Sequence, residues 1–254
     1  MEVPELLESI GPYLIDQLVA TSGTGTMWQA HHYITGVQVA LLVHHAAPTD
    51  AQLAKFHMTI GAIRNQHVCK LMEVGTAGDR SFLAYEWLDG PTLATEMPKP
   101  VAAFKPIVVE LLDGLAAIHA AKRVHGEARP ENVMLADRAV WIGFALLPVN
   151  PQDSFMSIGS PSYAAPEVIQ GEQFTARADL YAFGITMFQV LAGELPFTGK
   201  TFMEVCQAHI DKPPPLYLVP EALRGLLAVA LAKLPQDRFV DATAMRKAFI
   251  AAVG

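Results

Sequence analysis

Apolar and polar residues in the first third of the chain alternate with the period of a β-strand. One face of this expected strand carries Val37, Val39, Leu41 and Val43. Successive side chains of a strand point to opposite sides, so Ala40 and Leu42 must point to the other face. That second face is apolar too. The pattern therefore predicts a strand with one buried face and a second face that is also apolar.

A helix is expected directly after this strand. Thr49 and Gln52 have the spacing of a capping box, which marks a helix start. The apolar residues that follow at helical spacing are Leu53, Phe56, Ile60 and Ile63. Because they share one stripe, Phe56 is expected to face inward.

Asp89-Gly90-Pro91 marks a break in the pattern, and the chain after this break is predicted to be mainly helical. A core-facing helical stripe is formed by Val108, Leu111, Leu115 and Ile118. Residues 180–191 are apolar on nearly every side, which indicates a helix buried in the middle of this second part. We therefore expect an α+β protein with a strand-rich first part and a helical second part.

Composition and charge exclude several classes of function. The 254 residues are 52% apolar, which suits a compact globular protein. A net charge of −7 and the absence of any Lys/Arg run argue against nucleic acid as a partner. The longest apolar stretch is far shorter than the roughly 20 residues needed to cross a bilayer, so direct membrane contact is not expected. The expected location is the cytoplasm, either as a separate protein or as the cytoplasmic domain of a larger membrane protein. Cys69 and Cys206 have no CxxC spacing, so neither a disulfide framework nor a zinc site is indicated.

Seven motifs, in order along nearly the whole chain, resemble those of the bacterial Ser/Thr protein kinase family. In order, the segments SGTGTMWQA (22–30), VALL (39–42), YEWLDG (85–90) and HGEARPEN (125–132) are similar to the glycine-rich loop, the VAIK strand, the hinge and the HRDxKPxN catalytic loop. The segments GFA (143–145), GSPSYAAPE (159–167) and DLYAFG (179–184) are similar to DFG, to GTPxYxAPE and to the helix that follows. The resemblance implies a bilobal protein-kinase-like fold in a single domain, 1–254. Its N-lobe would span about 1–84, its hinge about 85–90 and its C-lobe about 91–254.

The chain departs from this family where the phosphate chemistry would be. In an active kinase a strand lysine holds the phosphates and pairs with a helix glutamate, and the DFG aspartate binds magnesium. Leu42, Phe56 and Gly143 stand at these three positions. Losing the lysine and the metal ligand together would weaken nucleotide binding by roughly 3–6 kcal/mol, at about 1.5–3 kcal/mol for each charged hydrogen bond. In the catalytic loop, Gly126 and Glu127 replace the arginine and aspartate of HRD, whereas Asn132 is retained.

The resemblance also implies roles for two further sets of residues. A degenerate nucleotide cleft would be lined by Ala20, Ser22, Gly23, Gly25, Ala40, Tyr85, Glu86, Trp87, Leu88 and Met134. Structural roles would fall to Ile60, Leu71, His125, Phe144, Glu167, Asp179 and Arg238. Glu167 and Arg238 would form a buried pair, and Asp179 would brace the catalytic loop.

These departures predict a catalytically inactive pseudokinase that acts as a protein-binding scaffold or allosteric regulator, with weak or no ATP binding. No cofactor and no metal ion are expected. The expected partner is a protein, such as an active kinase or another signalling protein, and the sequence is compatible with a homodimer.

Two other functions stay open at this point. The chain could be an unorthodox Ser/Thr kinase or a metal-independent nucleotide-binding module that uses Glu127 and Asn132, with Lys55 as the only close candidate for a relocated lysine. Alternatively, the first lobe could sense a metal or another ligand. Its histidines are His31, His32, His44, His45, His57 and His67, six of the nine in the chain.

Overall fold

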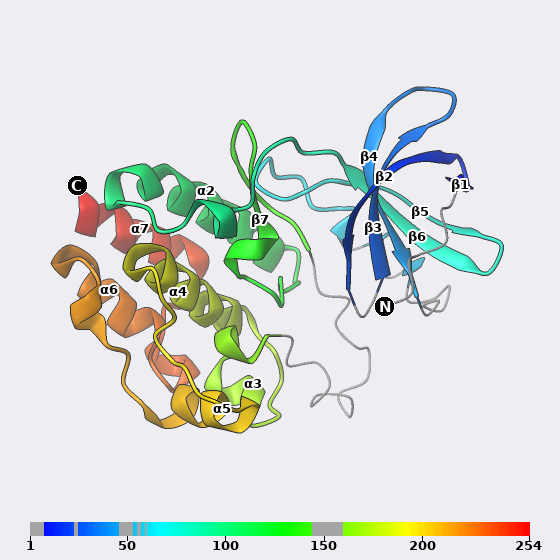
Figure 1. The fold of residues 1–254 in the computed structure, drawn as a ribbon. Helices are drawn as coiled ribbons and strands as arrows, with labels where there is room; N and C mark the ends of the chain where they lie inside the picture. The colour runs from blue at the N-terminus through cyan, green and yellow to red at the C-terminus, as the bar shows by residue number, and fades with distance from the viewer. Residues whose placement is uncertain (1–7, 23–24, 46–52, 55–56, 59, 144–159) are drawn as a thin grey trace. The chain divides into compact units, whose positions relative to one another are not determined.

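The structure is a computed structural model that describes residues 8–22, 25–45, 53–54, 57–58, 60–143 and 160–254 (Figure 1). Contacts divide the chain into two compact units. Unit 1 consists of Met1–Arg64 and Cys69–Leu88, and unit 2 of Asn65–Val68 and Asp89–Gly254. Unit 1 is rich in strands and unit 2 is mostly helical, so the predicted α+β class is confirmed.

Unit 1 is built on one antiparallel sheet. Its strands are β1 (Ser9–Ile10), β2 (Tyr13–Thr21), β3 (Gly25–His32), β4 (Gln38–His44), β5 (Leu71–Ala77) and β6 (Arg80–Glu86). They lie in the order β1-β2-β3-β4-β6-β5. Only one connection therefore departs from a simple meander, because β6 lies between β4 and β5.

The expected strand corresponds to β4. Val39, Leu41 and Val43 are buried in the core of unit 1. Val37 precedes the strand and is exposed, so the predicted start was too early by one residue. On the opposite face, Leu42 pairs across the sheet with Met27 on β3 and Leu83 on β6.

The helix predicted after β4 is only partly within the described residues. Leu53 and Ile60 are helical and buried, as their place on the stripe predicts. Phe56 and Lys55 lie outside the described residues, so the predictions that concern them stay predictions.

Unit 2 consists mainly of helices. They are α2 (Val101–Ala120), the short α3 (Pro166–Ile169), α4 (Ala176–Ala192), α5 (Phe202–Asp211), α6 (Glu221–Ala230) and α7 (Ala242–Val253), with a hairpin of β7 (Val133–Leu135) and β8 (Ala139–Trp141). The predicted stripe lies on α2 and is fully buried, with α7 packed alongside α2 (Figure 1). Residues 180–191 lie within α4, and nearly all of them are buried. None of the described helices is both long and apolar enough to span a bilayer.

Residues 65–68 belong to unit 2, although the chain on both sides of them belongs to unit 1. Val68 forms a parallel bridge with Trp141, and the Trp141 backbone N–H donates to the His67 carbonyl oxygen at 2.9 Å. This segment therefore lies beside β8 as a short extended stretch that pairs with the β7–β8 hairpin. A β-carbon at Gly114 on α2 would lie 2.8 Å from that same carbonyl oxygen, so the close approach requires glycine there.

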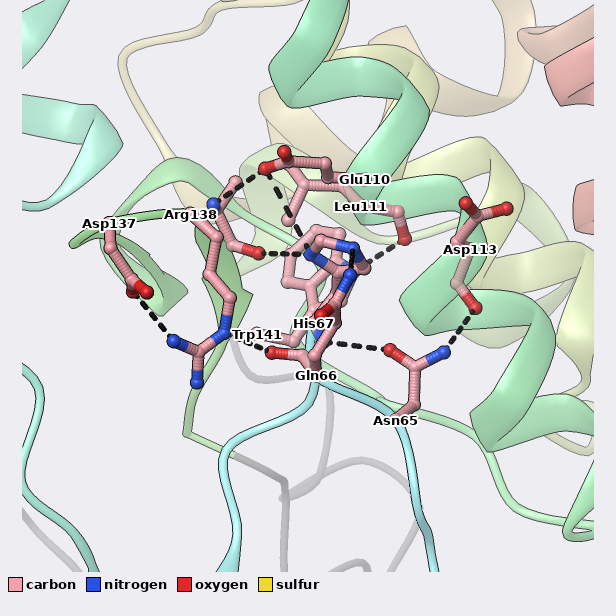
Figure 2. A network of polar contacts seen from close by, with 10 residues as sticks. Asn65, Gln66, His67, Glu110, Leu111, Asp113, Asp137, Arg138 and Trp141 are labelled. Atoms are coloured by element: carbon pink, nitrogen blue, oxygen red, sulfur yellow. Dashed lines mark hydrogen bonds and ion pairs between the residues drawn. The ribbon is translucent and has the colours of Figure 1, made fainter.

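Side chains hold this segment from two directions (Figure 2). The Asn65 amide donates to the Asp113 carbonyl oxygen on α2 and accepts from the His67 backbone N–H at 2.7 Å. The Arg138 Nε donates to the Gln66 carbonyl oxygen at 2.7 Å. Residues 65–68 were assigned to the N-lobe by sequence, but these contacts group them with the helical unit.

Candidate functional site

The loop of residues 125–132 is anchored by a carboxylate on α4. Asp179 is fully buried. Its two oxygens accept hydrogen bonds from the backbone N–H groups of His125 at 2.7 Å and Gly126 at 2.9 Å. The His119 Nε2 lies 2.8 Å from the same carboxylate. Since α4 is buried nearly throughout, the loop is fixed to a rigid element.

Gly126 adopts a left-handed backbone conformation, with φ of 83°. An L side chain at such a φ is strained by roughly 1–2 kcal/mol. At the position that carries an arginine in the family motif, the backbone conformation of this chain thus favours glycine.

Glu127 lies within this anchored loop. Its backbone N–H donates to His125 Nδ1 at 3.2 Å, and its carbonyl oxygen accepts from the Asn132 amide at 2.9 Å. A carboxylate oxygen lies 3.1 Å from the Arg129 Nε. Burial raises the pKa of Glu127, the Arg129 charge opposes this rise, and Glu131 adds to it. A carboxylate with a raised pKa is a stronger base than an exposed one.

Asn132 and Gly143 are in close contact. Gly143 has φ of 68°, and a β-carbon built there would lie 2.5 Å from the Asn132 Oδ1. Residue 143 offers no carboxylate, and its neighbour occupies the space that a side chain would need. In the described part of unit 2, Asn132 and Gly143, which stand at the family's metal-binding positions, therefore do not fit the magnesium ion that the family motif implies.

None of the unit 1 residues of the predicted cleft is a lysine or an arginine, and Leu42 adds no charge to the sheet face that it shares with Ala40. Leu42 and Ala40 are partly exposed on that face of β4, and Ala40 pairs with Tyr85 on the neighbouring strand β6. Tyr85 is buried, and desolvation raises the pKa of its phenol well above its usual range. This surface can contact an apolar ring but supplies no charge to a phosphate.

The glycine-rich segment is held in a turn by hydrogen bonds between its own residues. The Ser22 backbone N–H and its Oγ both donate to the Gly25 carbonyl oxygen, at 2.9 and 3.1 Å. A β-carbon at Gly25 would lie 2.6 Å from the Val43 carbonyl oxygen, so β3 can approach β4 only with glycine there. Ala20 is exposed at the end of β2, and Gly23 lies outside the described residues.

The predicted hinge begins at the end of β6. Glu86 accepts from the Lys70 backbone N–H through its Oε1 at 2.9 Å. Its own N–H donates to the Lys70 carbonyl oxygen. Trp87 and Leu88 are partly exposed. In unit 2, Met134 lies on β7 and is partly exposed.

The residues with predicted structural roles lie in the interiors of their units. Ile60 and Leu71 are buried in unit 1. His125 is buried in unit 2, where desolvation lowers its pKa to about 4. Arg238 donates from both Nη atoms to Glu167, each at 2.7 Å. Phe144 lies outside the described residues.

Sequence reasoning missed one residue within this loop and one residue on α2 that contacts the carboxylate anchoring it. Arg129 places a guanidinium beside Glu127, and His119 contacts Asp179 from α2. The signal for Arg129 was its place directly before Pro130 in the HGEARPEN segment, which contains no other arginine or lysine. His119 gave no signal, because its contact joins residues far apart in sequence.

The histidines of the first part do not gather into a metal site. Among the described residues no group of three or more His, Cys, Asp or Glu side chains could hold a metal ion. His31 pairs with Asp16 at 2.8 Å on the sheet, and His67 lies in unit 2.

Comparisons with known proteins agree with this fold. The model of the protein kinase domain matches residues 23–250. The chain is 30% identical over 94% of its length to the serine/threonine-protein kinase Pkn1 of Myxococcus xanthus, covering 38% of that protein. It is 28% identical over 92% of its length to the serine/threonine-protein kinase PknL of Mycobacterium tuberculosis strain H37Rv, covering 63% of it. It is also 28% identical over 96% of its length to the serine/threonine-protein kinases drp72 of Corynebacterium efficiens, covering 51%. The chain thus spans between about two fifths and two thirds of the length of these relatives.

These matches confirm the resemblance and the bilobal kinase-like fold class. They also overturn one prediction. The expectation that the chain is not an enzyme is wrong, because relatives that match more than nine tenths of it are named Ser/Thr protein kinases. The missing charges at Leu42 and Gly143 describe how the site differs from the family motif, and they are no proof of inactivity.

Proposed function

We propose that this chain, which belongs to the protein kinase domain family, is an atypical Ser/Thr protein kinase whose phosphoryl transfer does not depend on a metal ion at residue 143. The observation that carries this proposal is the position of Glu127. Its carboxylate belongs to a loop fixed by Asp179 and Asn132, and its raised pKa suits a general base.

Glu127 has a defined part in this reaction. It accepts the proton of a Ser or Thr hydroxyl on a protein substrate while that oxygen forms a bond to the γ-phosphorus of ATP. The bond from phosphorus to the leaving oxygen breaks, and ADP departs with the electron pair. The base must be ionised to act, so the rate rises as the pH increases through the raised pKa of Glu127.

Arg129 supplies the positive charge of the loop. Its side chain is one third exposed and lies beside Glu127, so part of it faces solvent. A guanidinium binds phosphate oxygens in a fork geometry and keeps its charge at all relevant pH values. It can therefore attract a phosphate that no metal ion neutralises, and its charge opposes the rise in the pKa of Glu127.

The test measures phosphoryl transfer from radiolabelled ATP to a mixture of Ser/Thr peptides, once with magnesium and once with chelator. We expect transfer in both buffers. The change Glu127→Gln should lower the rate by about 10²-fold or more, the usual contribution of a general base. The matched control is Glu96→Gln, which alters an exposed glutamate in an ion pair with Lys99 and should leave the rate unchanged.

Two outcomes would contradict the proposal. One is the absence of transfer in both buffers, and the other is a Glu127→Gln variant as fast as the unaltered chain. Thermal unfolding with ATP in chelator separates binding from transfer, since a ligand at about 100 times its Kd stabilises by roughly 2.7 kcal/mol. A shift without transfer would leave only the nucleotide-binding alternative.

A further inference from the structure

A hollow of about 610 Å³ lies on the sheet of unit 1. Its volume is in the range of about 300–1,000 Å³ that small-molecule sites occupy. Its lining is polar and comes from β2, β3, β4 and the turn between β3 and β4: Asp16, Gln17, Gln29, His31, Gly36 and Gln38. None of these residues belongs to the cleft that the kinase resemblance implies. The hollow is therefore a separate feature of the sheet.

A β-bulge on β2 brings two consecutive side chains to this hollow. Ile15 pairs with Ala30 on β3. The next pair joins Gln17 to Gln29, so Asp16 is an extra residue between the two pairs. Successive side chains of a regular strand point to opposite faces, whereas a bulge re-aims a side chain. Asp16 and Gln17 can therefore line the same hollow.

The polar side chains of the hollow hold one another in place. The Asp16 Oδ1 lies 2.8 Å from the His31 Nδ1, and the Gln17 Nε2 donates to the Gln29 Oε1 at 2.5 Å. Because a carboxylate only accepts, the His31 Nδ1 carries the hydrogen, and the Nε2 of the neutral ring is an acceptor. Gln38 lies opposite His31 on β4. Within the described part of the chain, no hydrogen bond uses the second Asp16 oxygen, the His31 Nε2 or the Gln38 amide.

These groups offer both donors and acceptors but little charge. The three glutamine amides can each donate and accept, and no lysine or arginine lines the hollow. An anionic ligand would meet the Asp16 carboxylate without a lysine or arginine to balance it. An apolar ligand would leave the polar groups unpaired, which is unfavourable. A neutral ligand with several hydroxyl groups fits best, because each hydroxyl both donates and accepts.

An apolar side chain borders this polar set. Leu14 pairs with His31 across β2 and β3, and it is 41% exposed. Side chains that are paired directly across two strands lie about 5 Å apart on the same face. A sugar ring carries C–H groups as well as hydroxyl groups, so it matches a surface that combines Leu14 with the polar residues.

We propose that the hollow binds the ring of a neutral sugar. Neighbouring hydroxyl groups of the sugar donate to the Asp16 carboxylate, and others exchange hydrogen bonds with the Gln29 and Gln38 amides. The hollow is open at Gly36, where an added β-carbon would meet no atom within 4 Å. A ring held here can therefore be a free monosaccharide or one residue of a longer saccharide.

The experiment titrates the full chain with D-glucose, D-galactose and maltotetraose and follows backbone amide shifts by NMR. We expect at least one of these sugars to bind with a dissociation constant on the order of millimolar and to shift the amides of Gln29, His31 and Gln38. Tighter binding of maltotetraose than of glucose would identify a longer saccharide as the ligand, and equal or weaker binding a free sugar. Glucose 6-phosphate is the charged comparison and should bind more weakly than glucose.

Two variants connect the binding to the hollow. Gln38→Leu should weaken it about five-fold, because one neutral hydrogen-bonding group is removed. Asp16→Asn keeps the size of the side chain and should weaken it about ten-fold, because a hydrogen bond to a charged group is stronger. The matched control is Gln207→Leu, which alters an exposed glutamine on α5 in unit 2 and should leave the affinity unchanged.

Three outcomes would overturn the proposal. The first is that none of the three neutral sugars shifts the amides of the hollow at about 100 mM, far above a millimolar dissociation constant. The second is tighter binding of glucose 6-phosphate than of glucose. The third is that Gln38→Leu and Asp16→Asn both bind as tightly as the control. None of these results depends on phosphoryl transfer.

Discussion

The Asn132 side chain occupies the space next to Gly143 in which a metal-binding carboxylate would have to begin. Its Oδ1 lies 2.5 Å from the β-carbon that any other residue would place there. The Asn132 amide is itself held by the Glu127 carbonyl oxygen at 2.9 Å. Both the backbone conformation at residue 143 and the packing of Asn132 against it therefore disfavour the aspartate of the family motif.

Restoring the aspartate should cost stability and create no metal site. We expect Gly143→Asp to lower the free energy of unfolding by about 1–2 kcal/mol for the left-handed backbone alone, plus the displacement of Asn132. Chemical denaturation measures this loss, and calorimetric titration with magnesium should show no binding. Gly143→Ala is the matched control, because it adds the β-carbon without the carboxylate and should lose a similar amount.

The contradicting outcome is specific. If Gly143→Asp binds magnesium and both variants keep the full stability of the unaltered chain, the backbone there adapts and Asn132 moves aside readily.

Lys122, which directly follows the C-cap residue of α2, adopts a backbone conformation that favours glycine. It is the only non-glycine residue with positive φ among the described residues, at 58°. Its N–H donates to the His119 carbonyl oxygen, and the Arg123 N–H donates to that of Ile118, which is the hydrogen-bond pattern of a Schellman motif. We expect Lys122→Gly to be more stable than Lys122→Ala by about 1 kcal/mol.

Thermal and chemical unfolding of the two variants measure this difference. The comparison with alanine removes the effect of losing the lysine charge near the helix end. Equal stability of the glycine and alanine variants would argue against a left-handed residue at this helix end.

The sequence predicted elements whose stability comes from a repeated apolar pattern. The face of β4 with Val39, Leu41 and Val43, and the stripe of α2, follow directly from side-chain periods of 2 and 3.6 residues. The start of α2 at Val101 was not found, because Pro106 inside the helix interrupts the signal that a helix normally gives.

Other features could not be read from the sequence because they depend on distant contacts. The sequence shows that Gly143 lacks a carboxylate, but its left-handed φ and its contact with Asn132 exist only in the folded chain. The raised pKa of Glu127 likewise arises from burial. Residues 65–68 carry no local sign that they dock on α2 and β8 (Figure 2).

The ion pair between Glu167 and Arg238 should contribute much more to stability than an exposed pair. Both side chains are almost fully buried, and Arg238 also donates to the carbonyl oxygens of Ala232, Arg177 and Lys233. Removing one charge leaves the other buried and unpaired, which costs about 3–5 kcal/mol. We expect a loss of this size for Glu167→Gln, measured by denaturant unfolding.

The matched control breaks an ion pair on the surface. Asp113→Asn removes the carboxylate that lies 3.0 Å from Arg246, where both side chains are at least one third exposed. Exposed pairs contribute about 0–1 kcal/mol, so this variant should be nearly neutral. Comparable losses in the two variants would mean that water screens the buried pair as well.

His209 should make the protein less stable as the pH falls. It is fully buried. Burial, and then the Lys233 charge, lower its pKa to about 4 from an ordinary value of 6.5. The unfolded chain therefore takes up a proton at a higher pH than the folded chain does. The stabilising contribution of the neutral ring is complete above about pH 6.5 and is lost as the pH falls toward 4.

The measurement is the free energy of unfolding at several pH values between 7 and 4. Each proton taken up only by the unfolded state contributes a slope of about 1.4 kcal/mol per pH unit. His209→Gln keeps a hydrogen-bonding group beside the Tyr181 hydroxyl, which lies 3.0 Å from the His209 Nδ1, and should flatten the slope. Some slope should remain, because His125 also has a pKa lowered to about 4. The exposed His57→Gln is the control, and a His209→Gln profile with the same slope as that control would show that His209 does not titrate in this way.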